Sequence, residues 1–166
     1  HADNKSEDGP PDALDAFDGG ELDAVVVRQE GSRRGGETLC TDEFGWFASP
    51  GFHWAKGEML RVATLASPCG VRATAARALD KARIKWNEAF IGGGVSAVVA
   101  AAAAGLAIAP LAKRIAPAGM VDVGPAFGLP RLSASKVMLY SRVSDASKQA
   151  ALRILAATFR KEAGTK

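Results

Sequence analysis

The spacing of apolar positions along the chain predicts strands that alternate with helices. Short, largely apolar runs, typical of buried strands, occur at 22–27, 44–48, 60–65, 86–91, 106–111, 120–123 and 136–140. Apolar positions that recur every three or four residues predict helices at 73–82, 95–104 and 145–161, and a short helix that opens near Pro10 and stops at Gly19. This alternation predicts an α/β fold with a largely parallel sheet, or two such sheets.

The pattern of the last helix also predicts how it starts and which side it buries. Ser144 stands where a helix cap is preferred, directly before the periodic positions begin. The residues expected on its buried stripe are Ala151, Leu152, Leu155 and Phe159.

An apolar run at residues 95–112 is long enough to raise the question of a membrane span. The run is mostly alanine, and Gly105 and Pro110 interrupt it, so a buried helix, a turn and a buried strand explain it better. The first residues show no basic region followed by an apolar core, and no signal peptide is expected. These observations favour a soluble, cytoplasmic protein without a membrane partner.

Charge is divided unevenly along the chain. Residues 1–30 carry nine acidic and two basic residues, a net charge of −7, whereas residues 31–166 carry nine acidic and nineteen basic residues, a net charge of +10. This division favours an anionic ligand in the basic part or head-to-tail pairing of subunits, although chance variation of solvated surfaces explains it as well. The two cysteines are too few for a disulfide framework and fit a reducing compartment.

Two strand-to-helix junctions are the most informative local feature. One spans Ser67 to Arg72 and includes Cys69, and the other spans Gly92, Gly93, Gly94 and Val95. A helix that starts directly after a strand leaves backbone N–H groups free at the positive end of its dipole. Two such starts in one lobe would make a receptacle for a small anion. The Arg72 side chain either clamps a carboxylate there or is simply solvated.

Other chemistry finds little support in the sequence. Gly92, Gly94 and Ala97 match a dinucleotide fingerprint, but the acidic residue that should follow the next strand is missing. Ser67 and Cys69 could be nucleophiles, but a helix cap and a small buried thiol are simpler interpretations. His53 is expected to be exposed in a turn. Neither a metal site nor a cofactor is expected.

The order of the sequence motifs along this chain resembles that in the effector-binding domain of LysR-type transcriptional regulators. Such domains have the two-lobed fold of type 2 periplasmic binding proteins. The motifs that carry the resemblance follow one another along almost the whole chain. They are Gly20-Glu21-Leu22-Asp23 with the strand after it, Phe44-Gly45-Trp46-Phe47, Ser67-Pro68-Cys69-Gly70-Val71-Arg72 with Ala78-Leu79 and Trp86, and Ala104-Gly105-Leu106-Ala107-Ile108-Ala109-Pro110. Ala107 replaces the second glycine of the family's pattern.

The resemblance implies a domain plan and a role. Lobe one would comprise 1–27 and 143–166, lobe two would comprise 28–142, and the hinge would include Val27, Arg28 and Ser141. A small, anionic effector would bind between the lobes and modulate DNA binding and transcription. Its contacts would come from a loop with Lys5 and Ser6, and from Ser67, Cys69, Arg72 and Gly92 to Val95.

The resemblance also implies partners, and the sequence departs from the family's pattern in two ways. The family forms antiparallel homodimers, tetramers in the full-length protein, and contacts promoter DNA through an N-terminal helix-turn-helix domain. That domain, and the opening strand and helix of lobe one, have no counterpart in these residues, so lobe one is expected to be incomplete. The function expected is ligand sensing without catalysis; the alternatives are a transporter's solute-binding protein and a small α/β enzyme that uses Cys69 or Ser67.

Overall fold

The computed structural model describes residues 13–29, 33–66 and 70–164. The chain divides into two compact units, of which the first comprises residues 1–41 and 135–165 and the second comprises residues 42–134. The division at 27/28 and 142/143 expected for the two lobes stays a prediction. The compact units differ from it because a strand at residues 37–42 and a strand at residues 135–141 belong to one sheet of the first unit.

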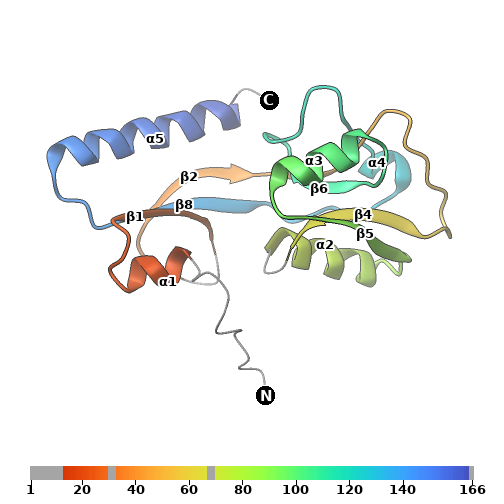
Figure 1. Ribbon diagram of the computed structural model, residues 1–166, viewed down its shortest axis with the longest axis horizontal. Coiled ribbons are helices and arrows are strands. Elements are labelled where there is room, and N and C mark those ends of the chain that lie inside the picture. The colour runs from red at the N-terminus through yellow and green to blue at the C-terminus, as the bar shows by residue number, and fades with distance from the viewer. Residues whose placement is uncertain (1–12, 30–32, 67–69, 165–166) are drawn as a thin grey trace, which may run out of the picture. The chain divides into compact units, whose positions relative to one another are not determined.

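The first unit is a three-stranded sheet with one helix on each face (Figure 1). Its elements are α1 (Ala13–Asp18), β1 (Ala24–Arg28), β2 (Glu37–Asp42), β8 (Ser135–Ser141) and α5 (Ala146–Gly164), with strand order β1-β8-β2. Val25 and Tyr140 pack with Phe17 of α1, whereas Leu139 packs with Ala156 of α5. The alternation of strand side chains between two faces explains why both helices find an apolar surface.

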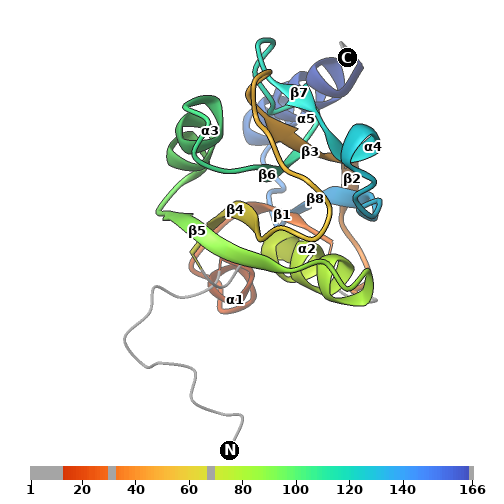
Figure 2. The same cartoon turned by 90° about the vertical axis from the view of Figure 1, so that its right-hand side faces the viewer.

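The second unit contains a three-stranded sheet and a two-stranded sheet, and α2 and α3 pack on opposite faces of the two-stranded one (Figure 2). Its elements are β3 (Phe44–Ala48), β4 (Leu60–Leu65), α2 (Gly70–Lys81), β5 (Trp86–Gly92), α3 (Val95–Ala103), β6 (Ala109–Ala112), β7 (Val121–Asp122) and α4 (Gly124–Phe127). Leu60 and Val62 pack with Leu79 of α2, whereas Ala63 packs with Val98 of α3.

Strand directions correct the expectation of a largely parallel sheet. β4 and β5 are parallel, and a parallel bridge joins Val62 to Ile108, because a helix connects each strand to the next. β3 is antiparallel to both β6 and β7, and β1 is antiparallel to β8. Helical crossovers enforce parallel pairing only between the strands that they connect, so the remaining strands are free to pair antiparallel.

The apolar run at residues 95–112 forms a helix, a turn and a strand, as the sequence predicts. Gly105 ends α3 with a φ of +82°, and the N–H groups of Gly105 and Leu106 donate to the carbonyls of Ala102 and Ala101. This left-handed ending is typical of a glycine-terminated helix. Across the described ranges, no helix combines the length and the apolar character that a membrane span requires.

Four local features differ from the prediction. β2 and α4 were not expected; β2 exists because it pairs with β8. The cap of α5 is Asp145 rather than Ser144, since the Asp145 carboxylate accepts the Lys148 backbone N–H at 3.2 Å. Ala151 is exposed and Leu155 is 36% exposed, because the buried face of α5 runs instead through Leu152, Ala156 and Phe159.

Candidate functional site

The candidate site lies at the edge of the second unit where β4 and β5 end. The two strands are parallel, and Leu65 is paired with Gly92 at the last position of both. The Ala66 backbone N–H donates to the Gly92 carbonyl at 3.1 Å just beyond that pair. Because α2 follows β4 and α3 follows β5, both helices begin at this edge, and their free N–H groups lie at one end of the sheet.

The three glycines at the second junction have different roles. A Cβ atom at Gly92 would lie 3.0 Å from Cγ2 of Val98 and 3.2 Å from Cβ of Ala97, so this glycine lets α3 pack closely on the end of β5. A Cβ atom at Gly93 or Gly94 would meet nothing within 4 Å. Gly94 is the extended N-cap of α3 and has no side chain to cap the helix. The open surface of this junction is therefore Gly93, Gly94 and the exposed Val95.

Arg72, in the first turn of α2, is held by an ion pair with Glu88 of β5. The arginine side chain is about one third exposed, and the glutamate is more deeply buried. The pair ties the start of α2 to the neighbouring strand, so Arg72 is more than a solvated surface residue. A guanidinium has five N–H donors in a planar fork, and one carboxylate does not occupy all of them.

A third strand brings further charges to the same edge, which the sequence interpretation missed. The parallel bridge between Val62 and Ile108 directs β6 along β4, so Arg114 follows its carboxyl end. Arg114 donates from Nε and Nη2 to the Asp42 carboxylate at 2.6 and 3.0 Å. Lys113 forms a looser, exposed ion pair with Glu43 at 3.6 Å. In the sequence, these residues could be noticed only because Asp42 and Glu43 directly precede one apolar run and Lys113 and Arg114 directly follow another.

Thr64 is a second residue that the sequence interpretation missed. It is the penultimate residue of β4, its side chain is buried, and its hydroxyl has no hydrogen-bond partner among the described residues. A buried hydroxyl without a partner is costly and rare in folded proteins. A threonine between the apolar residues Ala63 and Leu65 was the only sign of it in the sequence.

Several residues singled out in the sequence lie elsewhere. Lys5, Ser6, Ser67 and Cys69 are outside the described residues. His53 is exposed in the chain between β3 and β4, as expected. Cys40 is a buried cysteine within the apolar cluster of the first unit. Among the described side chains, no group of three or more histidine, cysteine, aspartate or glutamate residues is placed to hold a metal ion.

The expected hinge residues lie inside the first unit. Val27 and Arg28 are opposite Met138 and Val137 in the antiparallel pair of β1 and β8, and Ser141 is opposite Ala24 at the other end of that pair. The chain passes from one unit to the other at 41/42 and 134/135. A hinge role for these three residues stays a prediction.

Parallel strands that lead into helices at one sheet edge are typical of α/β domains that bind small molecules. A model of the LysR substrate binding domain matches residues 6–161 of this chain. The chain therefore belongs to the family of LysR substrate-binding domains. The HTH-type transcriptional regulator PecT of Dickeya dadantii (strain 3937) is 27% identical over 125 residues, which cover 75% of this chain and 40% of PecT. The chain thus spans less than half the length of this relative.

Solved structures show the same fold. Full-length HypT of Salmonella typhimurium, a hypochlorite-specific LysR-type transcriptional regulator, matches with a TM-score of 0.69 at 10% identity, over 90% of this chain and 56% of HypT. The CcmR regulatory domain of Synechocystis PCC6803, solved in complex with 2-PG, matches with a TM-score of 0.61 at 12% identity, over 89% of this chain and 78% of CcmR. The two-lobed type 2 periplasmic-binding-protein-like fold expected from the sequence is confirmed.

Proposed function

We propose that this domain senses a small organic acid, and that the edge where β4 and β5 end supplies part of the binding site. The observation that carries the proposal is the parallel pairing of Leu65 with Gly92, which brings the starts of α2 and α3 to one edge. Backbone N–H groups at helix starts bind anions without needing a dedicated side chain. Arg72 adds a guanidinium at the start of α2.

The groups at this edge suit a carboxylate better than a neutral ligand. Glu88 orients Arg72 and leaves part of its donor fork available. Gly93 and Gly94 place no side chain between the start of α3 and an approaching anion. The HypT regulatory domain has been solved with a bromide ion bound, so a related fold accepts an anion.

The proposed role in the longer protein is regulation of transcription by ligand binding, with no catalytic step. An effector changes the conformational equilibrium only through a difference in affinity between two states. In the proposal the regulator is cytoplasmic and contacts promoter DNA through a separate domain. The ligand-sensing domain forms an antiparallel homodimer, which the net charges of −7 for residues 1–30 and +10 for residues 31–166 would favour. Sedimentation at high concentration tests the dimer, and a monomer would contradict it.

Paired substitutions on α2 test the acid site. Isothermal titration calorimetry with a set of small carboxylates and their neutral amides identifies an acid that binds. Arg72→Ala should then weaken that acid about tenfold, since hydrogen bonds to a charged group contribute about 1.5–3 kcal/mol. Arg77→Ala is the matched control, because Arg77 is exposed on the same helix and donates a long hydrogen bond of 3.5 Å to the Thr74 hydroxyl of its own turn. Equal affinity in both variants would contradict the proposal.

A further inference from the structure

A cavity of about 530 Å³ lies beside β3 in the second unit, and the proposed function does not use it. Its walls come from β3 and the residue before it, from Lys113 after β6, and from β7, α4 and the chain after α4. None of the lining residues that the structure describes belongs to β4, β5, α2 or α3. The cavity therefore shares no residue with the strand ends and helix starts that are proposed to bind the effector.

Asp122 of β7 brings a partly free carboxylate to this cavity. Its Oδ1 accepts the backbone N–H groups of Trp46 and Gly124 at 3.1 and 3.0 Å, whereas Oδ2 has no hydrogen-bond partner among the described residues. Gly45 leaves room for Oδ2, since a Cβ atom there would lie 2.6 Å from it. Asp122 is half-buried, and Oδ2 is not sealed from solvent. A carboxylate oxygen in this position can accept from a cationic donor.

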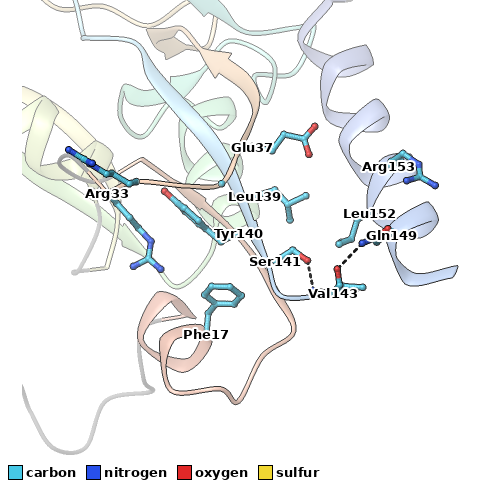
Figure 3. A pocket seen from close by; sticks show the side chains of 12 residues that line it. Phe17, Arg33, Glu37, Leu139, Tyr140, Ser141, Val143, Gln149, Leu152 and Arg153 are labelled. Carbon is cyan, nitrogen blue, oxygen red and sulfur yellow. Dashed lines mark hydrogen bonds between the residues drawn. The ribbon is translucent and has the colours of Figure 1, made fainter. Parts of the chain in front are cut away.

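The accessibility of Oδ2 distinguishes this cavity from another in the first unit, which lies beside β8 (Figure 3). There the polar atoms without a partner in the described part of the chain are the Tyr140 hydroxyl and Nε of Arg33. Both atoms are buried in the wall, so a ligand in that cavity could not reach them. The cavity in the second unit is therefore the one that offers a ligand an accessible, unsatisfied polar group.

The apolar wall of the cavity is held in place by the chain that follows α4. The Trp46 indole N–H donates to the Pro130 carbonyl at 2.9 Å, and the Leu129 backbone N–H donates to the Gly124 carbonyl at 2.9 Å. Gly128 ends α4 with a φ of +67°, which lets the chain turn there. The apolar lining residues are Phe44, Trp46, Pro125, Leu129 and Leu132. Such a lining with a few placed polar groups is typical of a small-molecule site.

The charged groups of the cavity indicate a ligand that carries both signs of charge. Besides Asp122 they are Glu43, Lys113 and Arg131, so the four formal charges cancel. Glu43 and Lys113 are paired with each other at 3.6 Å. Arg131 is exposed and forms no hydrogen bond or ion pair with another described residue. Two positions therefore remain for a ligand, one for an ammonium at Asp122 and one for a carboxylate at Arg131.

We propose that this cavity binds a free α-amino acid with an apolar side chain. The ammonium group of the amino acid donates to Oδ2 of Asp122, and its carboxylate accepts from the Arg131 guanidinium. Its side chain contacts the apolar wall, where burial of apolar surface adds affinity. The second unit then contains two ligand sites, one at the starts of α2 and α3 and one beside β3.

Titration of the isotopically labelled 166-residue chain with L-phenylalanine tests this proposal by NMR. The indole N–H signal of Trp46 should shift, whereas the signals of Trp54 and Trp86, which lie outside the cavity lining, should not. Phenethylamine lacks the carboxylate and 3-phenylpropionate lacks the ammonium. Each should therefore bind about tenfold more weakly than phenylalanine.

Two variants test the assigned contacts. Asp122→Asn keeps Oδ1 as the acceptor for Trp46 and Gly124 and replaces Oδ2 by an NH₂ group. This variant should keep its melting temperature and bind phenylalanine about tenfold more weakly. Arg131→Gln, at an exposed position, should weaken phenylalanine but not phenethylamine. Glu58→Gln is the matched control, because Glu58 is an exposed carboxylate of the same unit outside the cavity lining.

Three results would overturn the proposal. Phenylalanine could leave the Trp46 indole signal unchanged, 3-phenylpropionate or phenethylamine could bind as tightly as phenylalanine, or either Asp122→Asn or Arg131→Gln could bind phenylalanine as tightly as the parent chain. Arg72→Ala separates this site from the proposed effector site, since it should leave the Trp46 shift unchanged. A shift that disappears in Arg72→Ala would assign phenylalanine to the effector site instead. A shift that persists when no carboxylate binds at the start of α2 would contradict only the proposed function.

Discussion

Arg114 and Asp42 form a bidentate ion pair. Arg114 lies two residues after the end of β6, and Asp42 lies two residues before the start of β3. Nε donates to Oδ1 at 2.6 Å and Nη2 donates to Oδ2 at 3.0 Å, and the aspartate side chain is 2% exposed. A carboxylate this deeply buried requires a cationic partner. The pair therefore fixes the point where the chain enters the second unit, beside the edge proposed to bind the effector.

Arg114→Met should destabilise the domain strongly, because it leaves the Asp42 carboxylate buried without its guanidinium. We expect the free energy of unfolding to fall by about 3 kcal/mol, measured by urea denaturation at neutral pH. The double variant Asp42→Asn with Arg114→Met is the control, since it removes the buried charge and should recover part of the loss. A single variant as stable as the parent would show that the pair has no structural role.

Alanine at Gly92 should lower the stability of the domain, whereas alanine at Gly93 should lower its affinity for the effector. At Gly92 the new Cβ would press on Val98 and Ala97, so the start of α3 must shift, and unfolding should become easier by about 1–3 kcal/mol. At Gly93 the methyl group meets open space, so stability should change little, but it covers N–H groups of the proposed site and should lower effector affinity. Denaturation and calorimetry on both variants check this, and equal stability loss would contradict it.

Thr64→Val should stabilise the domain, which is unusual for a substitution in a core. Valine has the same shape and removes a buried hydroxyl that has no partner among the described residues. The melting temperature should rise, with a gain of about 1 kcal/mol in the free energy of unfolding. Ala63→Ser, at the adjacent buried position, is the control that should do the reverse. A loss of stability in Thr64→Val would show that its hydroxyl has a partner.

The pKa of Asp18 should depend on Arg33. Hydrogen bonds from the Arg33 guanidinium hold the pKa of the Asp18 carboxyl below its ordinary value. A lowered pKa stabilises the folded state above the ordinary value, and the contribution is lost as the pH falls through the folded pKa. Arg33→Gln should therefore raise the pKa of Asp18, as followed by NMR titration, and the stability difference between the variant and the parent should vanish at low pH.

Asp145 is the internal control for that titration. A hydrogen bond from the Ser147 hydroxyl and one from the Lys148 backbone N–H lower its pKa, and neither involves Arg33. Its titration should therefore be the same in both proteins. A shift of both carboxyl groups would indicate a general change of the unit rather than loss of the specific pair.

Much of the candidate site could be predicted because its signals are local. The glycines before α3 and the apolar runs of β4 and β5 are visible in the sequence, and so is Arg72. Glu88, Thr64 and the pair of Asp42 with Arg114 could not be predicted, since each depends on which residues face one another across strands that are distant in the chain.

The corrected elements show the same limit. β2 has only Leu39 and Cys40 as apolar residues, so its own pattern is weak, and it becomes a strand because β8 supplies its hydrogen bonds. On α5 the helix is predicted correctly, but Leu155 lies on a different face from the one expected. Helical periodicity defines an apolar stripe only to within about one residue position, and contact with the sheet selects Leu152, Ala156 and Phe159.

The sequence by itself determined the order of strands and helices, the two glycine-rich or small-residue junctions and the resemblance to LysR effector-binding domains. Those properties depend on neighbouring residues, whose spacing restricts the backbone directly. Tertiary structure decided the direction of each strand and the partners of Arg72 and Arg114. These depend on pairings between distant segments, and a linear pattern does not specify them.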